Sequence, residues 1–175
     1  MIKFCFLSGI HCQLVADDPV NLTPSFKVLM VCTANVCRSP AAQFFLQEHL
    51  KNHDVLVESA GVRAVDGNPA DPMMTEVLID RGIDGILQHR SRLLLPSFTT
   101  RYQLILCMER DHLLHVQALN PASMGRVKLL GHWDNQSEVE DPIGRSRKTY
   151  ESSVDRIQDL TRQWAEKMID MGIIA

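Results

Sequence analysis

The chain has 175 residues, of which 45% are hydrophobic and 22% are charged. This composition excludes a disordered, collagen-like or coiled-coil protein, and the length suits a single domain. The formal net charge is −3 at pH 7, from 18 basic and 21 acidic residues. Because basic residues are not in excess, nucleic acid and anionic membranes are not expected partners, and any anionic ligand must be bound locally.

Residues 1–25 are predicted to form an N-terminal extension and linker, which can be disordered. Their longest uncharged run, Phe4 to Ala16, is shorter than the roughly 20 apolar residues of a transmembrane helix. We therefore expect no membrane insertion. Lys3 followed by this apolar run also resembles a weak secretory signal, so secretion is an alternative to the cytoplasmic location that we expect.

The cysteines lie at positions 5, 12, 32, 37 and 107 and include no C-x-x-C pair. An odd number of cysteines in a chain of this length does not suggest a disulfide framework, and the spacing argues against structural zinc. We therefore expect a reduced, cytoplasmic protein that needs neither a metal nor an organic cofactor. One of the thiols is expected to have a chemical use.

The first predicted strand, Phe26–Val31, is a nearly continuous apolar run, typical of a strand that is buried on both faces. A short loop follows, and apolar residues then recur at helical spacing. Ser39 is the predicted N-cap of this helix, with Pro40 as its first residue. The loop therefore joins the carboxyl end of a buried strand to the start of a helix.

Strands and helices continue to alternate toward the C-terminus. The predicted strands are 54–59, 102–108 and 126–130, and the predicted helices are 72–82, 109–119 and one that follows Ser146. This order predicts an α/β fold, a doubly wound four-stranded parallel sheet with helices on both faces. In such folds ligands bind beyond the carboxyl ends of the strands, where the loop after the first strand lies.

Cys32 and Arg38 are separated by five residues in this loop. Backbone N–H groups of such a loop can bind an anion, and the helix dipole and the Arg38 guanidinium add positive potential. This environment would hold a phosphoryl group and favour the thiolate form of Cys32. The pattern therefore predicts a cysteine nucleophile that forms a phosphocysteine, with a buried packing cysteine as the alternative.

Asp141 is the candidate general acid. A leaving alkoxide or phenolate needs a proton that a thiolate cannot supply. Pro142 stiffens the loop around Asp141 and Gly144 gives it freedom, so the carboxyl group could be presented to the site. It would then activate the water that hydrolyses the intermediate. A simple turn at the D-P pair is the alternative reading.

The run V-C-T-A-N-V-C-R-S-P resembles the phosphate-binding loop of the low-molecular-weight protein tyrosine phosphatases. E-S-A-G at 58–61, G-N-P-A-D-P at 67–72, L-I-L-C-M-E at 104–109 and the later E-D-P follow in the family's order, so the resemblance extends from Phe26 to about Met171. It implies a phosphatase domain over residues 26–175 with Cys32 as nucleophile, Arg38 as phosphate binder and Asp141 as acid and base. It also implies a loop and a supporting hydrogen-bond network that include Thr33, Ala34, Asn35, Val36, Cys37 and Ser39, together with Ser59 and His89.

The chain departs from the family pattern at several positions. Ala34 replaces the usual glycine, so its backbone is expected to avoid positive φ. Ile143, Ala64 and Val65 stand where aromatic residues usually flank a phosphotyrosine ring, which leaves the substrate preference and the rate open. Cys37 is similar to the thiol that protects the nucleophile from irreversible oxidation, and simple packing is the alternative.

The segment G-H-W-D-N at 131–135 resembles most the bacterial branch that works opposite tyrosine autokinases in capsule or exopolysaccharide export. This resemblance implies a phosphotyrosine protein, such as an autokinase, as the partner. Arsenate reduction is less favoured because only Cys107 follows the loop. Phosphoarginine hydrolysis is less favoured because Val36 stands where related enzymes carry threonine. A phosphate-binding or redox-sensing module that uses Cys32 and Cys37 is the alternative from another functional class.

Overall fold

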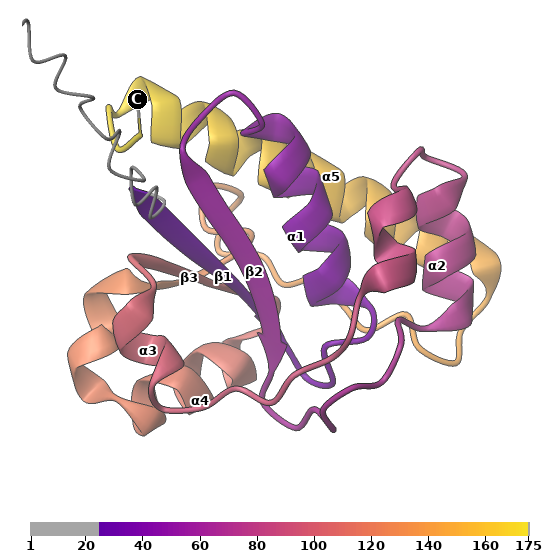
Figure 1. The fold of residues 1–175 in the computed structure, drawn as a ribbon, viewed down its shortest axis with the longest axis horizontal. Helices are drawn as coiled ribbons and strands as arrows, with labels where there is room; N and C mark the ends of the chain where they lie inside the picture. Colours follow the sequence, from indigo (N-terminus) through magenta and orange to yellow (C-terminus); the bar gives the residue numbers. More distant parts are fainter. Residues whose placement is uncertain (1–24, 175) are drawn as a thin grey trace, which may run out of the picture.

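The computed structural model describes residues 25–174, in which strands and helices alternate along the chain (Figure 1). The strands are β1 (Phe26–Cys32), β2 (Val55–Gly61), β3 (Leu104–Cys107) and β4 (Val127–Leu129). The α-helices are α1 (Arg38–His49), α2 (Pro72–Ile79), α3 (Phe98–Arg101), α4 (Arg110–Leu119) and α5 (Arg147–Asp170), and two short 3₁₀ helices are η1 (Asp84–Gln88) and η2 (Pro121–Arg126). The predicted extension lies outside the described residues except for Ser25, whose N–H and hydroxyl donate to Asp54.

The four strands form one parallel sheet in the order β2-β1-β3-β4. Figure 1 shows α1, α2 and α5 on one face of the sheet and α3 and α4 on the other. The predicted doubly wound α/β fold is therefore confirmed. β1 lies between β2 and β3, so neighbouring strands flank its carboxyl end. The loop after β1 lies beyond the carboxyl ends of the strands, where ligands bind in such folds.

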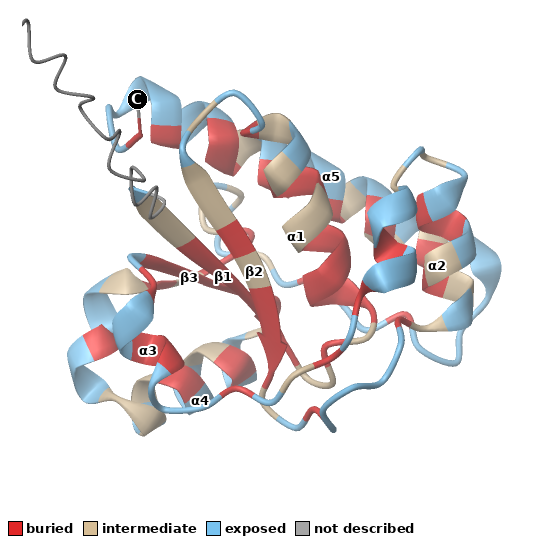
Figure 2. Cartoon of the chain, in the orientation of Figure 1, coloured by how far each residue is buried: buried red, intermediate tan, exposed pale blue. Residues whose placement is uncertain are grey.

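β1 is buried from Val28 to Cys32 (Figure 2). Its side chains in this part of the strand alternate between two hydrophobic cores. Val28 and Met30 pack in the core beneath α1, α2 and α5, whereas Leu29 and Val31 pack in the core beneath α3 and α4. This explains the continuous apolar run in the sequence. Packing against both cores and hydrogen bonds to β2 and β3 fix the position of β1, and therefore of Cys32 at its end.

Two helix starts agree with the sequence prediction and one does not. Asp71 accepts a hydrogen bond from the N–H of Met74, and the Ser146 side chain caps α5. Ser39, the predicted N-cap of the first helix, instead lies inside α1, which begins at Arg38 after Cys37. The prediction failed because the Ser39 hydroxyl is engaged by groups of the preceding loop rather than by the backbone of its own helix.

Among the helices of residues 25–174, none combines the length and apolar character that a bilayer-spanning segment requires.

Candidate active site

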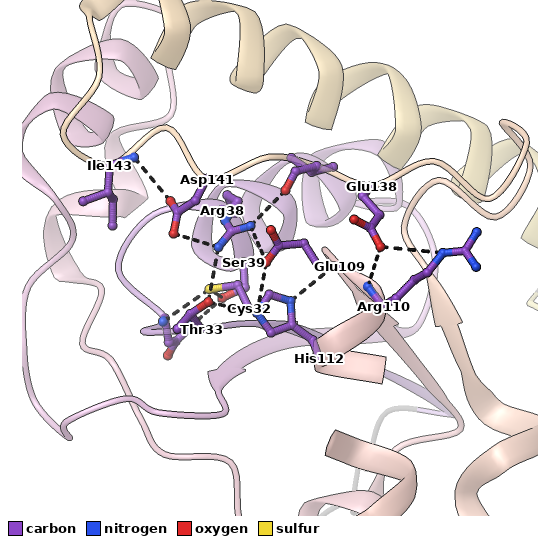
Figure 3. A network of polar contacts seen from close by, with 12 residues as sticks. Cys32, Thr33, Arg38, Ser39, Glu109, Arg110, His112, Glu138, Asp141 and Ile143 are labelled. Atoms are coloured by element: carbon purple, nitrogen blue, oxygen red, sulfur yellow. Dashed lines mark hydrogen bonds and ion pairs between the residues drawn. The ribbon is translucent and has the colours of Figure 1, made fainter. Parts of the chain in front are cut away.

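The candidate site lies at the carboxyl end of β1, where Cys32 is the last strand residue and Arg38 the first residue of α1. Figure 3 shows Asp141 reaching this loop from the segment that leads into α5. The structure thus brings together the three side chains that the sequence analysis selected for catalysis. The end of β2 lies against the same loop, because Cys32 is in register with Gly61.

Gly61 is the residue of β2 that allows this close approach. A Cβ atom at position 61 would lie 2.6 Å from the carbonyl oxygen of Thr33 and 2.8 Å from the backbone nitrogen of Asn35. Any larger residue would therefore push the loop between Cys32 and Arg38 away from the sheet.

The Cys32 sulfur receives two polar contacts from its own loop. The N–H of Asn35 donates to Sγ at 3.3 Å, and the Ser39 hydroxyl lies 2.9 Å from Sγ. Asn35 can aim its N–H at the sulfur because its φ is 57°, in the left-handed region that asparagine tolerates better than most residues. Ala34 has no positive φ, as its side chain requires.

The hydrogen-bond directions in the supporting network are fixed by groups that can only donate or only accept. The Asn35 side-chain amide donates to the hydroxyls of Ser39 and Ser59, each at 2.9 Å. Ser59 in turn donates to the carbonyl oxygen of the Gln43 side chain at 2.7 Å. Since Ser39 accepts from Asn35, its own proton is free for Cys32, which is the direction that stabilises a thiolate.

His89 and Arg92 hold Asn35 from the other side. The Nε2 atom of His89 lies 2.7 Å from the carbonyl oxygen of Asn35, and the backbone N–H of Arg92 donates to Asn35 Oδ1 at 2.9 Å. A carbonyl oxygen accepts only, so Nε2 carries the proton. Burial lowers the pKa of His89. The predicted network residues Asn35, Ser39, Ser59 and His89 therefore meet in one cluster, to which the structure adds Gln43 and Arg92.

Arg38 is only 1% exposed, and acceptors surround its guanidinium (Figure 3). Nη2 forms an ion pair with Asp141 at 2.8 Å and bonds Thr33 Oγ1 at 3.3 Å. Nη1 forms an ion pair with Glu109 at 3.0 Å and donates to the carbonyl oxygen of Val139 at 2.9 Å. A buried guanidinium is stable only when its charge is compensated in this way.

Glu109 and His112 were not predicted as site residues. The Nδ1 atom of His112 accepts the N–H of Glu109, so the proton of the neutral ring is on Nε2, which lies 2.9 Å from Thr33 Oγ1. Burial is the main cause that lowers the pKa of His112. The i,i+3 spacing of Glu109 and His112 at the start of α4 was a capping signal, but nothing in it indicated Arg38 as a neighbour.

The space above the Cys32 sulfur is nearly closed. Cys32, Arg38, Asp141 and Ile143 are among the residues that line a hollow of about 10 Å³, which suffices for about one water molecule. Asp141 closes this hollow from one side and pairs with Nη2 of Arg38.

Ile143 lines this hollow, whereas Ala64 and Val65, the other aliphatic positions noted in the sequence, do not. Ile143 is 44% exposed and Val65 is 68% exposed, whereas Ala64 is buried.

Cys37 and Cys107 are buried, and burial raises the pKa of both thiols, so they remain protonated near neutral pH. Within residues 25–174, no three His, Cys, Asp or Glu side chains are grouped so that they could hold a metal ion.

Comparisons with known proteins agree with this geometry. The family model "Low molecular weight phosphotyrosine protein phosphatase" matches residues 27–171. The low molecular weight protein-tyrosine-phosphatase Wzb of Escherichia coli (strain K12) is 36% identical over 141 residues, which cover 81% of this chain and 94% of that protein.

Two solved structures illustrate the similarity of the fold. Vibrio vulnificus Wzb in complex with benzylphosphonate has a TM-score of 0.76 and 32% identity, over 81% of this chain and 98% of that one. The YwlE arginine phosphatase from Geobacillus stearothermophilus has a TM-score of 0.77 and 28% identity, over 85% of this chain and 96% of that one. The two scores are nearly equal, so the backbone alone does not separate the two substrate types.

Proposed function

Because this chain belongs to the low molecular weight phosphotyrosine protein phosphatase family, we propose that Cys32, Arg38 and Asp141 carry out its phosphatase reaction. The enzyme hydrolyses phosphate monoesters. The observation that supports the three roles is that the Asn35 N–H and the Ser39 hydroxyl contact the Cys32 sulfur, and that Arg38, paired with Asp141, lines the same hollow as Cys32.

In the first step, the phosphoryl group replaces Asp141 on the Arg38 guanidinium and lies over Cys32. The thiolate attacks phosphorus, an S–P bond forms and the P–O bond to the leaving group breaks. Asp141 takes up a proton from solvent as it leaves Arg38 and gives this proton to the leaving oxygen. Backbone N–H groups of residues 33–38 and Arg38 stabilise the charge on the equatorial oxygens.

In the second step, Asp141 accepts a proton from a water molecule, whose oxygen attacks the phosphocysteine. The S–P bond breaks, inorganic phosphate forms and Cys32 leaves as a thiolate. The donors from Asn35 and Ser39 now stabilise the leaving sulfur, so the same contacts serve both steps. Val139 ties the Asp141 segment to the sheet, since its N–H donates to the Met108 carbonyl oxygen.

The roles of Cys32 and Asp141 are tested by turnover of aryl phosphates under reducing conditions. Cys32→Ser should abolish turnover. Asp141→Ala should slow substrates with poor leaving groups more than p-nitrophenyl phosphate, because only the poor leaving groups depend strongly on proton donation. A Cys32→Ser protein with wild-type turnover, or a wild-type protein that binds phosphate without turnover, would contradict the proposal and favour a binding module.

We also propose that the substrate is a phosphotyrosine protein in the cytoplasm, in particular a tyrosine autokinase. The names of the protein-tyrosine-phosphatase relatives support the substrate class. The need to keep a nucleophilic thiol reduced supports the location. Residues 26–175 would form the catalytic domain and residues 1–25 an extension.

A substrate-trapping pull-down with Cys32→Ser, together with phosphotyrosine, phosphoserine and phosphoarginine peptides, tests this assignment. We expect capture of a tyrosine-phosphorylated protein and a preference for phosphotyrosine peptides. A preference for phosphoarginine would instead assign the chain to the second substrate type found in this fold.

A further inference from the structure

A second hollow lies next to the network that supports the phosphate-binding loop. Its volume is about 360 Å³, and it shares no lining residue with the hollow above Cys32. This volume lies in the range of small-molecule sites. It is formed by α1, the end of β2, η1 and the segment after η1. The lining residues that matter here are Gln43, Phe44, Ser59, Gly85, His89 and Arg90.

His89 offers an unused polar atom to this second hollow. The side chain is only 8% exposed, and Nε2 is committed to the carbonyl oxygen of Asn35. Nδ1 has no hydrogen-bond partner among residues 25–174. It is also not among the fully buried polar atoms of these residues that lack a partner, so it remains accessible. When the ring is protonated, Nδ1 becomes a donor that a bound anion can accept from.

Arg90 supplies a positive charge that has no acidic partner. Its Nη1 atom donates only to the carbonyl oxygens of Leu87 and His89, and it forms no ion pair within residues 25–174. The neighbouring Arg92 differs, because it is paired with Glu58 at 3.0 Å. Glu58 and Arg92 both line the second hollow and compensate each other, so Arg90 leaves the lining with one uncompensated positive charge, which favours an anion.

Phe44 gives the second hollow an apolar wall. A Cβ atom at position 85 would lie 2.7 Å from Cε1 of Phe44, so the ring packs directly on the backbone of Gly85. Phe44 is half-buried and leaves part of its surface in the hollow. Phe44 therefore supplies aromatic surface against which a planar ring can pack.

We propose that this second hollow is an effector site for a small aromatic carboxylate. The carboxylate lies between the Arg90 guanidinium and His89 Nδ1, and the ring packs on Phe44. Burial and the charges of Arg90 and Arg92 lower the pKa of His89 in the free protein. The bound carboxylate opposes these effects, so His89 takes up one proton from solvent when the anion binds, and no covalent bond changes. The side-chain amides of Gln43 and Gln88 are within the same lining and supply polar contacts.

Occupation of the effector site is transmitted to Cys32 through Asn35. A doubly protonated His89 strengthens the Nε2–H bond to the Asn35 carbonyl oxygen, because the donor is then charged. That bond holds Asn35 at its positive φ, with its N–H on the Cys32 sulfur. This transmission rests on the proposed role of Cys32, whereas binding itself does not. We expect kcat/KM to rise by about two- to fivefold, a modest coupling between sites.

Benzoate is the probe for binding. Titration of ¹⁵N-labelled protein should give saturable shifts of the His89 ring nitrogens toward the protonated form and of the Gln43 and Gln88 amides. Arg90→Ala should weaken benzoate binding by about tenfold, as expected for loss of a charged hydrogen-bonding partner. Arg101→Ala, which removes an exposed arginine of α3 outside the hollow, is the matched control and should leave binding unchanged.

Kinetics with p-nitrophenyl phosphate separate this site from the active site. The rise in kcat/KM should be lost in Arg90→Ala and kept in Arg101→Ala. Absence of saturable shifts, or a benzoate effect that only raises KM and survives Arg90→Ala, would overturn the effector site. Binding without a rise in kcat/KM would overturn the transmission. Absence of turnover without benzoate would instead count against the proposed function.

Discussion

Asp141 has two partners in the proposed reaction cycle: Arg38 before the substrate binds, and the leaving oxygen of the substrate afterwards. The structure shows the ion pair with Arg38. The Asp141 side chain is 39% exposed although Arg38 is buried, so water screens the pair from one side, and moving Asp141 into solvent should cost only about 1 kcal/mol. The pair competes directly with an incoming phosphate. Substrate entry is therefore an exchange of anions on a guanidinium that is already in place.

This exchange predicts opposite effects of Asp141→Asn on binding and on catalysis. Inorganic phosphate should bind about fivefold more tightly, because a competing carboxylate has been removed. Turnover of poor leaving groups should fall by about 10²- to 10⁴-fold, because the proton donor is lost. Calorimetric titration with phosphate and steady-state kinetics measure the two effects. Weaker phosphate binding in the variant would contradict the exchange.

Ile143 allows a second prediction at the residue scale. It lines the hollow above Cys32 and is partly exposed, at a position where an aromatic ring could flank the substrate. Ile143→Tyr should raise kcat/KM for phosphotyrosine peptides by about two- to tenfold, the value of one aromatic pair. Phosphoserine peptides, which have no ring, serve as the control and should not gain. An equal gain for both peptides would contradict a stacking role.

The three side chains proposed for catalysis could be selected from the sequence because their signals are local. Cys32 and Arg38 share one loop, and Asp141 is marked by its D-P pair. Glu109 and Gln43 gave no comparable signal. They reach Arg38 and Ser59 only through the packing of α4 and α1 around the sheet, which no short sequence pattern records.

At the scale of elements, the phosphate-binding loop keeps its shape because β2 ends in a residue without a side chain. Gly61→Ala should displace the backbone of Thr33 and Asn35 and lower kcat/KM by more than about tenfold, since a displacement near 1 Å can cost far more than that. The free energy of unfolding should fall by about 1–3 kcal/mol.

Gly125→Ala is the matched control for this substitution. A Cβ atom at position 125 would meet nothing within 4 Å, and Gly125 has no positive φ. Activity and the free energy of unfolding should therefore stay close to wild type, as measured by aryl phosphate turnover and chemical denaturation. Equal losses in both variants would show that a general effect of alanine, rather than contact with the loop, is responsible.

The strands and the long helices were predictable because burial imposes a clear apolar pattern on them. The short helices η1, α3 and η2 were not predicted, since each has at most six residues and too few turns to show a period. Ser39 was misassigned for a related reason. A serine before proline is a good capping signal, but here the hydroxyl has partners in the loop.

At the scale of the whole molecule, buried histidines link folding to pH. Burial lowers the pKa of His89 and of His112 below the value of 6.5 that applies to an exposed ring. In the unfolded chain these rings take up protons near that value, so below it the unfolded state binds more protons than the folded state. The free energy of unfolding should therefore decrease as the pH falls from about 7.5 to about 5.5.

Urea denaturation across this pH range, in a buffer without phosphate, measures the effect. A double variant, His89→Asn with His112→Asn, should be less stable at every pH but should show a shallower decrease. An unchanged slope in the double variant would show that other groups cause the pH dependence.

The account as a whole rests on a covalent phosphocysteine at position 32. Rapid quenching of the enzyme with p-nitrophenyl phosphate, followed by mass spectrometry of its peptides, tests this most directly. We expect one phosphoryl group on the Cys32 sulfur, at higher occupancy in Asp141→Asn because the hydrolytic step then lacks its base. A phosphoryl group on another residue, or full turnover without any phosphorylated Cys32, would contradict the account.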